Sequence, residues 1–278
     1  MNQSIQQQSS SVGERPILEG RVVIITGASR GIGAATSRAF AAAGAAVALA
    51  ARDEAALASL ADQLLSGGGR AIAVPTDVAD PASVERLVDR TVGAFGRLDL
   101  AFNNAAGGGQ GPTPLADLPV DAYDSAITIT LRGVFLSMRY EIPAMLEAGG
   151  GAIVNMSSTA GLEGVGGLAG YVSAKHGVIG LTKTAALDYA DRNLRVNALA
   201  PGPILTDDLE RAGEDAQRLA ALAMPMRRIG RPEEVAAAVV WLCSDQAAFI
   251  TGATLPIDGG KLAGAAPFRS TQPQPHGQ

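Results

Sequence analysis

Three side chains suited to proton transfer at an alcohol oxygen stand close together in the sequence. Tyr171 and Lys175 are four residues apart in an apolar-periodic run, and Ser158 precedes the tyrosine by thirteen residues. Residues four apart share one face of a helix, so the phenol and the ammonium are expected side by side. A free tyrosine has a pKa of about 10, and a nearby cation lowers it by stabilising the phenolate. The spacing therefore predicts a general acid/base, although most Tyr–Lys pairs at this spacing are surface contacts.

A glycine-rich turn near the start of the chain has the composition of an anion site. The β-branched run 21–26 predicts a buried parallel strand, and the helical pattern 34–43 follows the turn. Gly27 permits the tight turn, while Gly31 and Gly33 let backbone amides approach a pyrophosphate at the helix N-terminus. The spacing is G-x-x-x-G-x-G rather than the commoner G-x-G-x-x-G. Its place between a strand and a helix favours a dinucleotide site over a chance turn.

With these motifs the chain resembles the short-chain dehydrogenase/reductase family, and within it the FabG-like (β-ketoacyl-reductase-like) group. The resemblance covers about residues 18–262, and its motifs stand in the order and spacing of the family. These motifs are the turn 26–33, Asp77 with Val78, the segment 103–105, Ser158, Tyr171 with Lys175, the segment 195–197, and Pro201 with Gly202. The resemblance implies reversible hydride transfer between a nicotinamide cofactor and a ketone or secondary alcohol.

The resemblance also implies roles for the residues of the active site. Tyr171 donates the proton to the forming alkoxide, Lys175 lowers the pKa of that tyrosine, and Ser158 hydrogen-bonds the substrate oxygen. The family spacing selects Ser158 over the neighbouring Ser157. Thr130 stands where the family often has an asparagine that helps to hold a water of a proton relay. Its hydroxyl can donate and accept but reaches less far, which leaves its part in such a relay open.

The cofactor is expected beside the first strand, at the carboxyl ends of the strands. The residues expected to hold it are Gly27, Ser29, Arg30, Gly31, Ile32, Gly33, Arg52, Asp77, Val78, Asn104, Ala105, Tyr171, Lys175, Pro201, Gly202, Ile204 and Thr206. Ala51 stands where family members that use NAD carry an acid, whereas Arg30 and Arg52 offer guanidinium groups to a 2′-phosphate. Asp53 is either that acid, displaced, or the cap of the next helix, and we favour the cap. We therefore expect NADP(H) to be preferred over NAD(H).

The alternation of apolar strands and helices predicts an α/β protein, a single-domain doubly wound Rossmann fold. The resemblance implies a seven-stranded parallel sheet, in the order 3-2-1-4-5-6-7, with helices on both faces. Strands are expected near 21–26, 45–50, 71–76, 98–103, 151–157, 194–200 and 253–257, and helices near 31–43, 54–65, 81–95, 120–147, 170–191, 206–223 and 232–243. The dinucleotide-binding and catalytic domain is expected over 18–262, between a flexible leader, 1–17, and a flexible tail, 263–278.

Composition limits the partners of this chain. A net charge of −5 argues against nucleic acid, and no apolar run reaches the length of a membrane span. The single cysteine, Cys243, lies in an apolar stretch, and two histidines alone make no zinc site, so neither a disulfide nor a metal is expected. A cytoplasmic enzyme is the default. The apolar helical patterns 120–147 and 170–191 exceed what one sheet face covers, and with the family resemblance they predict a homotetramer.

Three segments are expected to form the substrate side of the site: 108–112, 160–168 and 204–226. Their mostly small and apolar residues favour a small, mainly apolar carbonyl substrate over a polyanion. A lyase or epimerase on the same scaffold and a nucleotide-sensing protein without catalysis remain alternatives. The sensing alternative predicts that the tyrosine or the lysine is lost, and this chain has both Tyr171 and Lys175.

Overall fold

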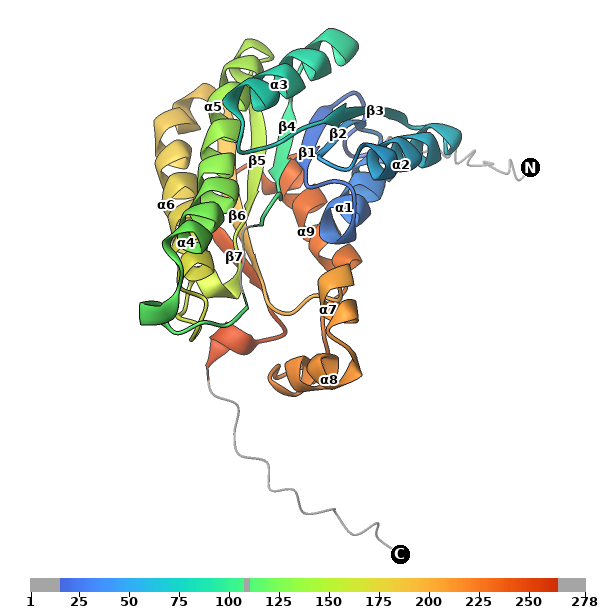
Figure 1. Ribbon diagram of the computed structural model, residues 1–278. Coiled ribbons are helices and arrows are strands. Elements are labelled where there is room, and N and C mark those ends of the chain that lie inside the picture. The colour runs from blue at the N-terminus through green and yellow to red at the C-terminus, as the bar shows by residue number, and fades with distance from the viewer. Residues whose placement is uncertain (1–15, 108–110, 265–278) are drawn as a thin grey trace, which may run out of the picture.

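The fold is built on one parallel sheet, in a computed structural model that describes residues 16–107 and 111–264. The strands of the described residues are β1 (Val22–Thr26), β2 (Ala46–Ala51), β3 (Arg70–Pro75), β4 (Leu100–Asn103), β5 (Gly151–Met156), β6 (Leu194–Pro201) and β7 (Thr254–Ile257). They pair in parallel in the order β3-β2-β1-β4-β5-β6-β7 (Figure 1). The predicted Rossmann fold and strand order are confirmed, and the chain changes direction across the sheet between β1 and β4.

Helices cover both faces of this sheet. They are α1 (Gly31–Ala42), α2 (Glu54–Ser66), α3 (Pro81–Phe95), α4 (Val120–Ala126), α5 (Gly133–Glu147), α6 (Ala169–Tyr189), α7 (Asp207–Arg211), α8 (Glu214–Leu222) and α9 (Pro232–Cys243). A π-helical segment, η2 (Ile127–Arg132), joins α4 to α5, and short 3₁₀ turns span Leu115–Asp117, Thr159–Gly161, Ala190–Arg192, Asp245–Ala247 and Lys261–Ala263. One core cluster joins α1, α2 and α9 to the sheet, and a second joins α3, α5 and α6 to its other face (Figure 1).

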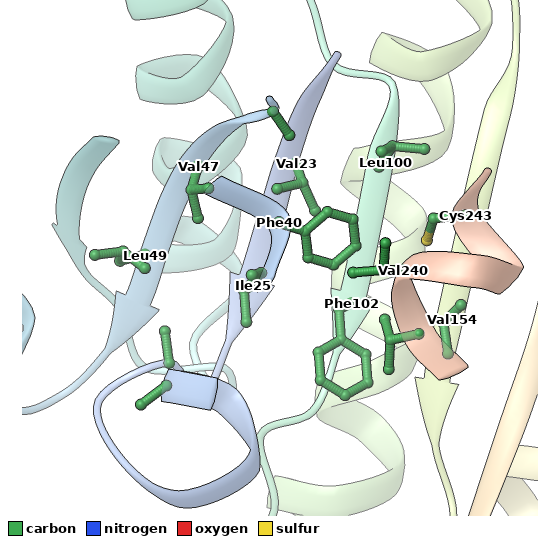
Figure 2. Close-up of a cluster of buried hydrophobic side chains, with 14 of the residues drawn as sticks. Val23, Ile25, Phe40, Val47, Leu49, Leu100, Phe102, Val154, Val240 and Cys243 are labelled. Atoms are coloured by element: carbon green, nitrogen blue, oxygen red, sulfur yellow. The ribbon is translucent and has the colours of Figure 1, made fainter. Parts of the chain in front are cut away.

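The first core cluster explains why the central strands read as unbroken apolar runs. All five residues of β1 are buried, since helices cover both of its faces. Val23 and Ile25 point to the face where Phe40 of α1 and Val240 of α9 pack, as Figure 2 shows. Burying one such side chain stabilises the fold by about 1.5–3 kcal/mol. Cys243 belongs to the same cluster, and burial raises the pKa of its thiol to about 12, which agrees with the expected core thiol.

Two long helices of the sequence prediction are interrupted. The expected helix 206–223 is two helices, α7 and α8, because Gly213 between them adopts a φ of 87°, which a helix does not allow. The expected helix 120–147 contains the π-helical segment η2, which inserts extra backbone into the helix beside the site. Periodicity predicts the apolar face of a long helix, but it does not locate a one-turn change in hydrogen bonding.

The two ends of the predicted domain lie at the limits of the described residues. Leu18, just inside the expected domain, is buried in the core. The expected leader, 1–17, and tail, 263–278, fall almost entirely outside the described residues, so both stay predictions. Within the part of the chain that the structure describes, no helix combines the length and the apolarity that a membrane span requires.

Candidate active site

An open cleft of about 790 Å³ lies at the carboxyl ends of the strands. Its walls are formed by the segments that follow β1 to β6 and by the start of α6. This is where ligands of doubly wound sheets bind, because the loops on either side of the direction change leave a crevice there. Every residue predicted to hold the cofactor lines this cleft except Gly33.

Gly33 shapes the cleft from behind. A Cβ atom at Gly33 would lie 2.0 Å from the carbonyl oxygen of Gly27 and 2.9 Å from Asn104 Nδ2. That amide nitrogen donates to the carbonyl oxygens of Thr26 and Gly27, each at 3.1 Å. Gly27 itself has a φ of 65°, where side chains are strained. Two glycines therefore allow the turn to close tightly against the loop that follows β4.

The N-terminus of α1 faces the cleft with unused donors. Arg30 occupies the N-cap position, its side chain makes no cap hydrogen bond, and the first turn of α1 carries no acidic side chain. The first backbone N–H groups of a helix have no partner within the helix, and its dipole favours an anion there. With Gly31 and Ile32 lining the cleft, this donor set fits a pyrophosphate.

The acid at the end of β2 lines the cleft and is also engaged as a helix cap. Asp53 caps α2, since its Oδ1 accepts from the backbone nitrogen of Ala56 at 3.0 Å, which confirms the favoured interpretation. Ala51 and the exposed Arg52 both line the cleft. Asp77 lines it too, although its Oδ1 also accepts from the backbone of Ala79 at 2.9 Å in a local turn. The end of β2 therefore brings to the cleft the guanidinium group of Arg52 and the carboxylate of Asp53, which is engaged as a helix cap.

The structure reveals an ion pair across the cleft that the sequence analysis missed. Arg30 Nη1 lies 3.0 Å from Asp208 Oδ1 and 3.9 Å from Asp207 Oδ2. The pKa of Asp208 is lowered, mainly because Arg30 hydrogen-bonds its carboxylate. Both acids begin α7 and line the cleft. The positive charge of Arg30 is thus already offset in part. No pattern in the sequence predicts a pair of residues that are 178 positions apart.

The two neighbouring serines after β5 have different surroundings. Ser157 is buried, and its hydroxyl donates to the carbonyl oxygen of Lys175 at 2.9 Å. Ser158 is half-buried, lines the cleft and accepts from the backbone nitrogen of Ala160 at 3.1 Å. Its hydroxyl is also close enough to Tyr171 to oppose the rise in the pKa of that phenol. Ser158 is therefore the serine whose hydroxyl is available beside the phenol, as the spacing indicates.

Tyr171 and Lys175 share one face of α6, as expected, but their electrostatics differ from the expectation. Lys175 Nζ lies 5.6 Å from the centre of the Tyr171 ring and donates to the carbonyl oxygen of Met156 at 2.8 Å. Burial lowers the pKa of Lys175 to about 7. Burial also raises the pKa of Tyr171, and the hydrogen bond with Ser158 opposes that rise. The expected lowering of the tyrosine pKa by the lysine is thus not found, because desolvation favours the neutral form of both groups.

Thr130 lies beside the cleft rather than in its wall. Its side chain is buried in η2, where Oγ1 donates to the carbonyl oxygen of Gly107 at 3.2 Å and lies 3.4 Å from the Gly107 backbone nitrogen. Gly107 and Ile129, the residue before Thr130, line the cleft. The hydroxyl of Thr130 therefore holds the loop after β4 in place. Its part in a proton relay stays a prediction.

The expected substrate wall is present in part. Residues 108–110 lie outside the described residues, and none of 160–168 is among the residues that line the cleft. Of the segment 204–226, four residues line it, namely Ile204, Thr206, Asp207 and Asp208. Glu163 forms an ion pair with Lys261, which ties the loop after β5 to the segment that follows β7. The described wall is thus more acidic than the sequence suggested.

Comparisons with known proteins agree with this geometry. A family model described as Enoyl-(Acyl carrier protein) reductase matches residues 27–261. The chain is 47% identical over 249 residues to the A-factor type gamma-butyrolactone 1'-reductase (1S-forming) of Streptomyces virginiae, over 88% of this chain and 96% of that protein. It is 43% identical over 239 residues to the cyclohexanol dehydrogenase of Acinetobacter sp. (strain SE19), over 86% of this chain and 94% of that protein. The crystal structure of levodione reductase matches with a TM-score of 0.84 and 36% identity, over 89% of this chain and 100% of that one.

Substituting Gly33 tests the tight packing behind the cleft. Gly33→Ala is expected to lower the free energy of unfolding by about 1–3 kcal/mol, because the new Cβ collides with backbone that must move. It also displaces the amides of the turn, so the affinity for a dinucleotide falls. Chemical denaturation and a cofactor titration by fluorescence measure both effects.

Gly93→Ala is the matched control. Gly93 lies in α3 with nothing within 4 Å of an added Cβ, so alanine is expected to stabilise the helix by about 0.5–1 kcal/mol. Equal stability of the parent and Gly33→Ala would contradict the assigned role of Gly33.

Proposed function

The chain belongs to the short-chain dehydrogenase/reductase family, and we propose that it is an NADP-dependent oxidoreductase for a small, mainly apolar ketone or secondary alcohol. Family membership makes it an enzyme that acts on CH–OH and C=O groups with a nicotinamide cofactor. The single observation that supports the catalytic assignment is the meeting of Ser158, Tyr171 and Lys175 in the cleft that also contains the glycine-rich turn.

The protein residues of this proposal move and hold a proton at the substrate oxygen. When bound, the nicotinamide supplies a hydride to the carbonyl carbon, or accepts one from the alcohol carbon. In the reduction direction, the neutral phenol of Tyr171 gives its proton to the carbonyl oxygen, which becomes the hydroxyl of the product. The raised pKa of Tyr171 keeps the phenol protonated at neutral pH, so the proton is present to be given. Ser158 donates a hydrogen bond to the same oxygen, and that bond strengthens as negative charge develops there.

We assign to Lys175 the step that gives a proton back to Tyr171. Its pKa of about 7 lets the amine take up and release a proton near neutral pH. Its Nζ stands beside the ring of Tyr171 and is held by the carbonyl oxygen of Met156. In the oxidation direction the same steps occur in reverse, and the phenol oxygen of Tyr171 accepts the proton of the alcohol.

The proposed preference for NADP(H) depends on the charges at the adenosine end. Arg52 lines the cleft, Ala51 is uncharged, and Asp53 is engaged as a helix cap. A guanidinium group hydrogen-bonds a phosphate strongly and in two places. Arg30 shares its charge with Asp208, so Arg52 is the principal candidate for the 2′-phosphate.

The proposed substrate is a ring ketone or ring alcohol. Two of the compared proteins are named for ring compounds, a gamma-butyrolactone and cyclohexanol. The acidic pair Asp207 and Asp208 at the rim disfavours polyanionic substrates. A panel of cyclic ketones, open-chain ketones and keto acids, followed by the loss of NADPH absorbance, distinguishes these classes.

Replacing the phenol tests the catalytic assignment. Tyr171→Phe is expected to lower kcat by about 10²–10⁴-fold, because it removes a general acid without removing the ring. The dissociation constant of NADPH, measured by fluorescence titration, should stay close to that of the parent. Tyr189→Phe, at the far end of the same helix, is the control and should leave kcat unchanged. Activity of Tyr171→Phe within tenfold of the parent would refute the assignment.

Removing one guanidinium group tests the cofactor preference. Arg52→Ala is expected to lower kcat/KM with NADPH by about tenfold or more while leaving kcat/KM with NADH nearly unchanged, because only NADPH carries the 2′-phosphate. Arg86→Ala removes an exposed arginine of α3 as the control. Asp208→Asn removes the carboxylate that pairs with Arg30, so it should raise the ratio of kcat/KM with NADPH to kcat/KM with NADH. A parent enzyme that prefers NADH would show that Asp53 or Asp77 binds the ribose instead.

The proposed homotetramer depends on apolar side chains that the single chain leaves exposed. Phe135 of α5 is 46% exposed, and Leu187 of α6 is 83% exposed. Both helices lie on the same face of the sheet (Figure 1). A contiguous exposed apolar patch marks a contact surface, and we propose that these two side chains belong to one. Trp241 of α9, 38% exposed, is proposed for the second interface of a tetramer.

Light scattering after size exclusion measures the oligomeric state. The parent chain is expected to have the mass of a tetramer, and the double variant Phe135→Asp with Leu187→Asp the mass of a smaller species, because charges in an apolar interface are costly. Leu219→Asp changes an exposed leucine of α8 and should leave the tetramer intact. A monomeric parent at micromolar concentration would contradict the proposal.

A further inference from the structure

A buried polar cluster lies behind the cleft and joins two strands to two helices. Glu141 of α5 is 1% exposed, and its Oε2 accepts from Asn103 Nδ2, at the end of β4, at 3.0 Å. The same amide donates to Asn155 Oδ1 of β5 at 3.1 Å, and Asn155 donates to Thr182 Oγ1 of α6 at 3.0 Å. The proposed reaction uses none of these four side chains.

Two acceptors in this cluster have no donor among the described residues. They are Asn103 Oδ1 and Glu141 Oε1, and both are inaccessible to solvent. An amide oxygen and an ionised carboxylate only accept hydrogen bonds, so they cannot satisfy each other. A proton on Glu141 turns its carboxyl group into a donor. The side chains of Glu141 and Asn103 are already held together by the hydrogen bond from Asn103 Nδ2. A buried acceptor left unpaired costs about 1–3 kcal/mol. A proton on Glu141 that is donated to such an acceptor therefore stabilises the folded chain.

The surroundings of Glu141 contain no charge that would keep it ionised. Within the described residues, no lysine, arginine or histidine nitrogen lies within 4.0 Å of its carboxylate oxygens. The neighbours from β4, β5 and α6 are the neutral Asn103, Asn155 and Thr182, and the side chains that α3 buries are uncharged. The buried cation of α6 is Lys175, whose Nζ binds the Met156 carbonyl. Burial accordingly raises the pKa of Glu141 to about 7, against a smaller lowering by the Asn103 hydrogen bond.

We infer that Glu141 is a positioning residue, a neutral carboxylic acid below neutral pH, that through Asn103 fixes the end of β4 from which the cofactor cleft is built. The residues directly after Asn103 make the contacts of that cleft. The backbone nitrogens of Asn104 and Ala105 donate to Thr26 Oγ1 at 3.0 and 3.1 Å. Ionisation of Glu141 places a negative charge next to the unpaired oxygen of Asn103. The repulsion between them weakens the contacts that hold Asn103 and the loop after β4 in place.

Protonation of Glu141 makes the stability of the fold depend on pH. The pKa of Glu141 in the folded protein, about 7, lies above the ordinary value of 4.5. The folded chain therefore holds a proton that the unfolded chain releases, so this contribution to stability is full below pH 4.5 and is lost as the pH rises through 7. Glu141→Gln keeps the shape and a donor but does not titrate. Relative to this variant, the unfolding equilibrium constant of the parent should rise by at least about tenfold between pH 5 and pH 8.

Two measurements test the protonation state. Denaturation of the parent, Glu141→Gln and Glu147→Gln over this pH range should show the flatter profile only for Glu141→Gln, since Glu147 is exposed at the end of the same helix. Infrared spectra of the native parent should contain the carbonyl band of a buried protonated carboxyl group, which fades above neutral pH and is retained by Glu147→Gln. Parallel stability profiles would overturn the inference. So would a parent spectrum without that band at about pH 5, even if Glu141→Gln does not fold.

A third measurement tests the positioning role and rests on the proposed function. The dissociation constant of NADPH should rise about threefold or more between pH 6 and pH 8 in the parent, beyond any rise in Glu141→Gln. The reason is that only the parent has a carboxyl group at position 141 that ionises in this range. Equal pH dependence in the two proteins would overturn the positioning role. If neither protein binds NADPH, the proposed function fails, while the infrared and denaturation measurements still decide the state of Glu141.

Discussion

The architecture of the site depends on one close contact between the ends of two adjacent parallel strands. The amide of Asn104, after β4, donates to the carbonyl oxygens of Thr26 and Gly27, after β1. The hydroxyl of Thr26 in turn accepts from the backbone of Asn104 and Ala105. The chain changes direction across the sheet at these two strands, and Gly27 and Asn104 both line the crevice there. This contact also requires glycine at position 33, where a side chain would meet the same carbonyl.

Burial has a second effect on the site, through the protonation of three groups around it. Desolvation lowers the pKa of Lys175, raises that of Tyr171 and raises that of Glu141. In each case the low-polarity interior disfavours the charged form. Near pH 7 the site therefore contains a protonated phenol and an amine whose pKa of about 7 lies close to that pH. The charges at the rim, Arg30 with Asp208, are by contrast exposed and contribute little to stability.

The short helix α7 adds negative charge to the cleft. Asp207 and Asp208 bring two carboxylates to a wall that also includes Asp53 and Asp77, beside the cations of Arg30, Arg52 and Lys175. Their position next to the glycine-rich turn moderates the attraction of the cleft for phosphates, since opposite charges within a few ångströms offset each other. Arg52, which also lines the cleft, has no ion pair among the described residues that would offset its charge in the same way.

The sequence by itself determined the fold, the strand order through the family resemblance, and many of the residues that line the cleft, although none of the expected segment 160–168 lines it. These follow from local signals: apolar strands bounded by turns, a glycine spacing, a tyrosine four residues before a lysine, and Asp53 in the position of a helix cap. Only the tertiary structure decided the charge state of the tyrosine and lysine, the pairing of Arg30 with Asp208, and the breaks in two helices. It also brought Glu141 to Asn103 across 38 residues. Such properties depend on which distant groups exclude water or lie within a few ångströms, and residue spacing along the chain does not record that.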